Sequence, residues 1–315
     1  MTAPTLFELQ ASVQDKAAFR TLDDYYRICQ AFLDLLSTTQ PTRIVSPNDF
    51  RYVFFQFDER HAYRITRPLN SDLFIHSVDV FRATFSRFFA FLADLKRFQH
   101  TGSEQAHIQK YLVANEVNQV VYTIQQAIGS IGDSFENPNQ ARKRIGQLFE
   151  NLIKLIIKEV GFACESRTIF VPLPDSPDYS MSYELDLVFS NKGAILASET
   201  ELVHPLEVVG SVKTTSKDRL DKIFLDKFML SRLLGYELKV IAIFLHDVQR
   251  ARKGKSIFGI NPTFKTNHFL GYTLALNRLN GVYYVDPRPE MQTDPRLSSE
   301  IRDFQHFLTT DIWQL

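Results

Sequence analysis

Lysines and acids are concentrated in GSVKTTSKDRLDKIFLD, residues 210–226. This pattern predicts a short strand, a polar turn and a charged helix, with Lys213 at the strand end and Asp226 in the helix. A strand-end lysine near carboxylates is typical of metal-assisted phosphate chemistry. Residues 217–219, a cation–acid–cation triplet, are predicted to open the helix, where such a triplet could read base edges. Packing alone accounts poorly for both features within one short stretch.

Two further carboxylates could complete a site. Asp186 lies between two leucines in the predicted strand 183–190, where a charge is costly unless it is paired or binds a metal. Glu150 lies in a helix with an apolar stripe. Carboxylate oxygens bind divalent cations, while Lys213 can orient a water and neutralise developing charge. The alternative is that Asp186 and Lys213 form only a cross-strand ion pair and that Asp226 is an exposed helix charge.

Composition narrows the class of protein. The chain has 315 residues, 44% hydrophobic and 23% charged, which predicts a globular protein with one large or two modest domains. Its 36 basic and 36 acidic residues balance, so DNA contacts would come from clusters at 142–144, 213–219 and 250–255, each of which could also be a solvated face. Two cysteines, no signal peptide and no bilayer-length apolar run predict a cytoplasmic protein without membrane contact.

The first 130 residues are predicted to be mainly helical. One helix is expected over 15–36, and apolar residues at three- and four-residue spacing predict two more, over 74–92 and 108–128. Residues 51–58 indicate a strand or an aromatic connection. Residues 129–138 are rich in Gly, Ser, Asp, Asn and Pro, which favours a hinge.

The second half alternates helices and strands, which indicates an α/β fold with a mixed central sheet flanked by helices. A helix is expected over 139–160, with Gly161 as its C-cap. The elements expected after it are a proline-rich loop 171–182, a strand 183–190, a tight turn 191–193 into a strand 194–198, a strand 206–213, a helix 217–234 and an apolar strand 238–245.

Two other kinds of site are disfavoured. Residues 210–214 lack the first glycine of a phosphate-binding loop, and Val212 precedes the lysine. No histidines show HxxxH or HExxH spacing, so a zinc hydrolase is disfavoured. His204 and His246 are expected in loops or the core.

These residues resemble the active site of type II restriction endonucleases of the PD-(D/E)XK fold, in the group of EcoRII, SsoII, PspGI and NgoMIV, which reads CCGG, CCNGG or CCWGG cores. The resemblance covers about residues 140–245. In the usual motif an acid stands two residues before the lysine, and here Ser211 occupies that position. In this group a carboxylate of the following helix takes over, which implies Asp226, where the relatives mostly carry Glu.

The resemblance implies a metal site and contacts to DNA. It places Asp186, Asp226 and Glu150 around Mg²⁺. Lys217 and Arg219 would donate to guanine O6 and N7, and Asp218 would accept from cytosine N4. Contacts to the phosphate backbone are predicted for flanking basic and hydroxyl residues, namely Arg142, Lys143, Arg144, Thr214 and Thr215.

The sequence thus predicts a mainly helical N-terminal region, 1–135, and a restriction-endonuclease-like α/β core, 136–315. The N-terminal region could clamp DNA, mediate dimerisation or bind an effector. The expected activity is Mg²⁺-dependent double-strand cleavage of palindromic DNA with a CCGG or CC(N)GG core, TCCNGGA being the preferred form, by a homodimer that could pair into tetramers. A catalytically silent DNA-binding protein and a repair or recombination nuclease are the alternatives. Branch members that read interrupted sites flip central nucleotides onto an aromatic, for which the nearest candidates are Tyr52, Phe54 and Phe55, although core packing is favoured for each.

Overall fold

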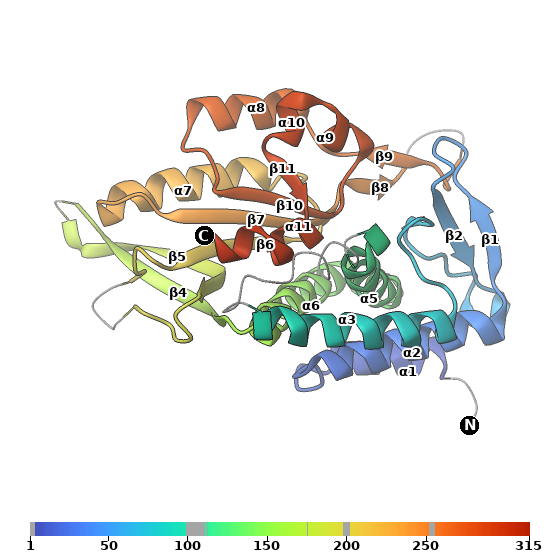
Figure 1. Ribbon diagram of the computed structural model, residues 1–315. Helices are drawn as coiled ribbons and strands as arrows, with labels where there is room; N and C mark the ends of the chain where they lie inside the picture. Colours follow the sequence, from blue (N-terminus) through green and yellow to red (C-terminus); the bar gives the residue numbers. More distant parts are fainter. Residues whose placement is uncertain (1–3, 99–110, 112, 175, 198–201, 252–255) are drawn as a thin grey trace. The chain divides into compact units, whose positions relative to one another are not determined.

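The structure, a computed structural model, describes residues 4–98, 111, 113–174, 176–197, 202–251 and 256–315 (Figure 1). The chain forms two compact units. Of the described residues, the first unit contains 4–94, 111, 113–152, 248–251 and 256–263, and the second contains 95–98, 153–174, 176–197, 202–247 and 264–315. Each unit is thus assembled from more than one segment of the chain.

The first unit is mainly helical, as the sequence predicts. Thr21 forms a capping box with Asp24, which starts the second helix at Leu22, seven residues after the expected start. Helix α5 (Glu116–Gly132) is buried on nearly all sides, and the side-chain amides of its Gln125 and Gln126 donate to backbone carbonyls. The helices are α1 (Leu6–Gln14), α2 (Leu22–Thr39), α3 (Val78–Phe98), α5 (Glu116–Gly132) and the start of α6 (Pro138–Glu159).

Small sheets complete the first unit. The antiparallel sheet contains β1 (Thr42–Val45), β2 (Tyr52–Gln56) and β3 (Leu69–Asn70), and β8 (Val248–Arg250) pairs with β9 (Ile260–Pro262). Tyr52 and Phe54 pack against Val248 and Ile260 in a small core, so core packing is confirmed for these two aromatics. Phe55 is half-buried. Of the cluster 250–255, positions 252–255 lie outside the described residues.

The second unit is built on a six-stranded mixed sheet with the order β11-β10-β7-β6-β5-β4. Strand β5 pairs antiparallel with both β4 and β6, whereas the pairs β6–β7, β7–β10 and β10–β11 are parallel. The strands are β4 (Ala163–Leu173), β5 (Ser176–Ser190), β6 (Val208–Lys213), β7 (Lys239–His246), β10 (Gly281–Asp286) and β11 (Ile301–Asp303). The mixed α/β fold is as predicted.

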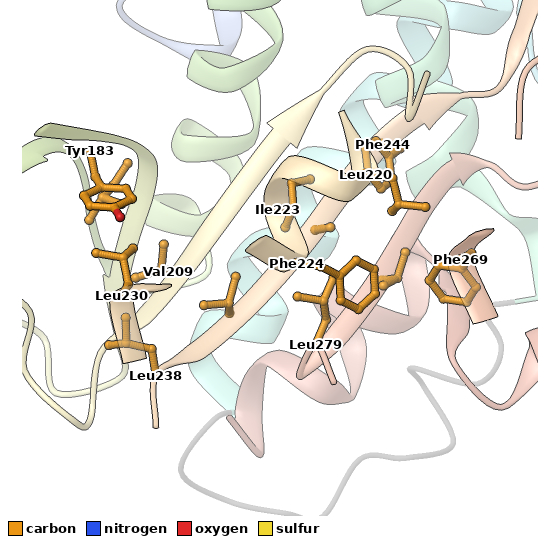
Figure 2. Close-up of a cluster of buried hydrophobic side chains, with 14 of the residues drawn as sticks. Tyr183, Val209, Leu220, Ile223, Phe224, Leu230, Leu238, Phe244, Phe269 and Leu279 are labelled. Atoms are coloured by element: carbon orange, nitrogen blue, oxygen red, sulfur yellow. The ribbon is translucent and has the colours of Figure 1, made fainter. Parts of the chain in front are cut away.

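Helices cover both faces of this sheet. Helices α7 (Leu220–Leu234) and α8 (Thr266–Ala275) bury Phe224 and Phe269 against Phe244 of β7 in one core (Figure 2). On the opposite face, Phe307 of α11 (Phe304–Thr309) packs on Tyr283 of β10. Short helices α9 (Pro289–Thr293) and α10 (Pro295–Ser298) connect β10 to β11. In the described part of the chain, no helix is both long enough and apolar enough to span a membrane.

Two expectations for the sheet are wrong. A loop over 171–182 is not observed, because residues 171–173 and 176–182 belong to β4 and β5, which pair as a long antiparallel hairpin, and position 175 lies outside the described residues. Strand β6 pairs with β5 only at residues 187–189. The prolines of the hairpin lie outside that stretch, so their missing N–H groups break no hydrogen bonds to a further strand. The turn 191–193 exists, with Gly193 at φ +73°, but residues 194–197 form no strand, and position 198 lies outside the described residues.

Candidate active site

A β-bulge places Asp186. Glu165 pairs with Val188 and Arg167 with Leu185, so β5 advances three residues where β4 advances two. A bulge of this kind bends the strand and redirects a side chain, and bulges are frequent near active sites. The Ser166 hydroxyl donates to the Asp186 carbonyl oxygen at 2.8 Å, which satisfies the backbone at the irregularity.

The Asp186 carboxylate faces the end of β6. Its Oδ2 accepts from Lys213 Nζ at 2.5 Å, from the Val212 backbone N–H at 2.8 Å and from Ser211 Oγ at 3.3 Å. Ser211 and Lys213 lie two residues apart on β6 and therefore share one face of the sheet. The Asp186 side chain is 14% exposed and that of Lys213 is 30% exposed, so both can be reached by a substrate.

The residues fit a magnesium ion that keeps most of its water. The hydrogen bonds from Lys213, Val212 and Ser211 to the Asp186 carboxylate reach Oδ2, so Oδ1 is the candidate metal ligand. Among the described residues, no group of three or more His, Cys, Asp or Glu side chains is arranged to hold a metal. Magnesium typically uses one or two carboxylates, with water and substrate phosphate filling the other positions. A site based on one protein carboxylate satisfies that chemistry.

The two other predicted carboxylates lie on helices. Asp226 forms an ion pair with Lys222 one turn earlier in α7. It also lies near Tyr183 of β5, where burial and the Asp226 charge raise the pKa of the tyrosine. Glu150 is half-buried in the part of α6 that belongs to the first unit. Metal binding by Asp226 and Glu150 therefore stays a prediction.

The predicted base-reading triplet lies in a turn. Helix α7 begins at Leu220, so the expectation that residues 217–219 open the helix is wrong. The turn is closed by the Ser216 carbonyl, which accepts from the backbone N–H groups of Arg219 at 3.0 Å and Leu220 at 3.2 Å. Asp218 has φ +54°, a left-handed conformation that Asp tolerates better than most residues. All three side chains of the triplet are exposed.

The predicted phosphate-binding residues differ in their surroundings. Arg144 donates to the carbonyl oxygens of Val13 at 2.7 Å and Asp15 at 2.6 Å, and burial lowers its pKa. These bonds connect α6 to the C-terminal end of α1, so Arg144 has a role within the protein. The remaining candidates are still accessible, with Arg142 and Lys143 exposed and Thr214 and Thr215 half-buried.

Sequence reasoning missed two buried acids. Asp247 follows β7 directly, and its carboxylate accepts from Ser216 and from the Tyr284 hydroxyl. Glu207 precedes β6 and accepts from Arg167 and from three backbone N–H groups. Asp247 adjoins a strand that is almost wholly apolar, and Glu207 precedes a strand that begins with two buried valines. Those positions were the available signal, because a charge there is expected to have partners.

No protein-family model matches the chain, and no curated protein matches its sequence. Among solved structures, it is similar to the crystal structure of the Type IIP restriction endonuclease Kpn2I, with a TM-score of 0.66 and 18% identity over 98% of this chain and 96% of that chain. It is also similar to restriction endonuclease PspGI in complex with substrate DNA, with a TM-score of 0.40 and 14% identity over 62% of this chain and 79% of that chain. The likeness to Kpn2I shows that this chain has the fold of a type IIP restriction endonuclease.

Proposed function

We propose that the protein is a type II restriction endonuclease that cleaves palindromic duplex DNA with Mg²⁺. The observation that carries the proposal is the Asp186–Lys213 pair, held at 2.5 Å where β5 bulges beside the end of β6. The fold shared with Kpn2I along nearly the whole chain supports it. A structural ion pair would need neither the bulge nor the partial exposure of both side chains.

The two residues have distinct roles in hydrolysis. Lys213 is oriented by Asp186, so its ammonium group can hold the attacking water and neutralise charge that develops on the phosphate. The water oxygen bonds to phosphorus while the bond from phosphorus to the 3′ oxygen breaks. The water gives up a proton and the 3′ oxygen gains one, which leaves a 5′-phosphate and a 3′-hydroxyl. Asp186 and the further predicted ligands Asp226 and Glu150 would hold Mg²⁺, which would supply a lower pKa for the water and neutralise phosphate charge.

The proposed substrate is a palindrome with a CCGG or CC(N)GG core. Lys217 and Arg219 would donate to guanine, and Asp218 would accept from cytosine, in each half-site. Their exposure on a turn four residues beyond Lys213 supports a reading role close to the scissile phosphate. Two copies related by a two-fold axis would match the symmetry of the DNA.

Digestion of DNA of known sequence tests the proposal. With Mg²⁺ the wild-type protein should give discrete fragments that map to one palindrome, and a chelator should abolish cleavage. Asp186→Ala and Lys213→Ala should each lower the cleavage rate by roughly a thousandfold, the upper range for one transition-state contact, while specific binding persists. Asp178→Ala and Lys192→Ala serve as matched controls, since both side chains are exposed in the same unit.

Other results would support other functions. Smearing or nicking without a defined site would indicate a repair or recombination nuclease. Specific binding without cleavage would indicate a silent DNA-binding protein. Wild-type cleavage rates in Asp186→Ala or Lys213→Ala would show that the pair is structural.

A further inference from the structure

A buried hydrogen-bond network fixes the turn that carries Lys217, Asp218 and Arg219. Asp247, the first residue after β7, accepts from the Ser216 backbone N–H at 2.9 Å and from Ser216 Oγ at 2.8 Å. Its second oxygen accepts from Ser216 Oγ at 2.7 Å and from the Tyr284 hydroxyl at 2.5 Å. The network therefore joins the turn to β10 through one carboxylate.

The network is isolated from water. Asp247 and Tyr284 have no exposed surface and Ser216 is 3% exposed. A buried carboxylate is costly unless hydrogen-bonded, so these donors are needed to keep Asp247 in place. Burial and the adjacent Asp247 carboxylate raise the pKa of Tyr284, so its hydroxyl stays protonated and able to donate.

The network also sets the spacing between the reading turn and the candidate active site. Ser216 accepts the N–H groups that close the turn, so fixing Ser216 fixes the backbone of the triplet. One residue before Asp247, the His246 N–H donates to the Thr214 carbonyl at 3.4 Å. Lys213 pairs with Phe244 in the parallel register of β6 and β7. The end of β7 thus positions Lys213 and the turn together.

We propose that Asp247 is a positioning residue for DNA sequence discrimination, acting through Ser216 on the turn 217–219. This inference rests on the proposed endonuclease function and adds a residue that touches neither DNA nor metal. Without the Asp247 acceptor, the turn samples several conformations, and the triplet meets correct and incorrect base pairs more equally. The loss therefore falls mainly on discrimination between sites, because Lys213 keeps its own bond to Asp186.

The test compares cleavage of the cognate palindrome with cleavage of a site changed at one C·G pair. Asp247→Ala should lower the ratio of the two rates by roughly tenfold, within the range for one lost base contact. Ser216→Ala and Tyr284→Phe should give smaller reductions, since each removes only some of the donors. Asp247→Asn should restore part of the ratio, because its amide oxygen can still accept from the Ser216 N–H.

Tyr283→Phe is the matched control. Tyr283 lies beside Tyr284 on β10, is also buried, and donates to Asp311 at 2.9 Å, so its variant loses a similar bond away from the turn. Its discrimination ratio should stay at the wild-type value. Amide hydrogen exchange of residues 214–220, measured without DNA, should be faster in Asp247→Asn than in wild type and unchanged in Tyr283→Phe.

Each outcome decides the proposal. Unchanged discrimination in folded Asp247→Ala, or unchanged exchange of residues 214–220 in Asp247→Asn, would overturn it. If Asp247→Ala fails to fold, the discrimination ratios of Ser216→Ala and Tyr284→Phe are compared with that of Tyr283→Phe. Equal ratios in all three variants would overturn the proposal. Wild-type protein that cleaves no defined site would refute the endonuclease function and the reading role together, whereas wild-type cleavage with insensitive variants refutes only the role of Asp247.

Discussion

Ser211 occupies the position two residues before Lys213 where the PD-(D/E)XK motif has an acid, and its hydroxyl donates to Asp186 at 3.3 Å. A serine in this position supplies no negative charge, and Asp186 is the carboxylate that accepts from the lysine. It also helps to orient that carboxylate, because it shares Oδ2 with Val212 and Lys213. We propose that a second carboxylate for the predicted metal site comes from elsewhere in the chain, and Asp226 is the predicted source.

Glu207 gives the strongest expectation for pH dependence at the residue scale. Burial raises the pKa of this carboxyl, but hydrogen bonds from the N–H groups of His204, Leu196 and Ala197 and from Arg167 outweigh burial, so the pKa is lowered. A lowered carboxyl pKa stabilises the fold above the pKa of the unfolded chain, about 4.3 for Glu. This stability is lost as pH falls through the lower, folded-state value. The free energy of unfolding should therefore decrease as pH falls below about 4.3.

Glu207→Gln should remove this part of the acid sensitivity and lower the free energy of unfolding at pH 7. The loss should be roughly 3–5 kcal/mol, because Arg167, whose side chain is 15% exposed, loses a buried partner. Glu165→Gln is the control, since Glu165 pairs with the same arginine but is 45% exposed, and it should cost about 0–1 kcal/mol. Denaturant titrations at pH 3 to 7 measure both effects. Parallel pH profiles for wild type and Glu207→Gln would contradict the assignment.

Helices and strands with a regular spacing of apolar residues were the most predictable elements. The helix expected over 139–160 is α6, and Gly161 follows it at φ +99°, the left-handed conformation expected of a C-cap glycine. The strand expected over 206–213 is β6, which starts two residues later. The strand expected over 238–245 is β7, which starts and ends one residue later. Burial on fixed faces determines these elements, and burial is visible in the order of apolar residues.

The errors arise where tertiary contacts override local signals. Prolines in 171–182 favour a loop, but the outer hairpin position tolerates them. Helix α7 starts at Leu220, later than expected, because Ser216, held by Asp247 just after β7, closes a turn first. In the candidate site, the sequence identified Asp186 and Lys213, while the bulge depends on the register between β4 and β5. No pattern within a single strand specifies that register.

Gly210 tests the packing of the strand that carries Lys213. A Cβ at this position would lie 3.2 Å from Leu187 Cβ and 3.3 Å from its Cδ1, tighter than side chains normally pack. Leu187 is fully buried, so it has little room to move. Gly210→Ala should therefore lower the free energy of unfolding by about 1–3 kcal/mol.

Gly271 provides the opposite control. It lies in α8, and nothing lies within 4 Å of a Cβ placed there. Gly271→Ala should stabilise the protein by up to about 1 kcal/mol through helix propensity. Chemical denaturation of both variants measures the difference in sign. A neutral or stabilising Gly210→Ala would show that β5 and β6 adjust freely beside the candidate site.

At the scale of the whole molecule, the expected reaction requires two active sites. Each copy of this chain carries one Asp186–Lys213 pair, and a double-strand cut breaks one phosphodiester in each strand. The two strands of a palindrome are related by a two-fold axis, so a symmetric dimer would present one pair to each strand. We therefore expect a DNA complex with two chains of 36.4 kDa on one site, which sedimentation or light scattering can measure.

Subunit mixing tests whether each copy cuts one strand. Lys213→Ala chains, which lack the proposed catalytic lysine, should still fold and bind DNA, because Lys213 is a partly exposed strand-end residue. Mixed with wild-type chains, they should form dimers with one working site, which nick the DNA. On supercoiled plasmid with one cognate site, nicked circles should accumulate in proportion to mixed dimers while linear product falls. Lys192→Ala chains, mixed in the same ratios, should leave the linear product unchanged. Loss of linear product without nicked circles would show that both strands depend on one site or that cleavage requires a larger assembly.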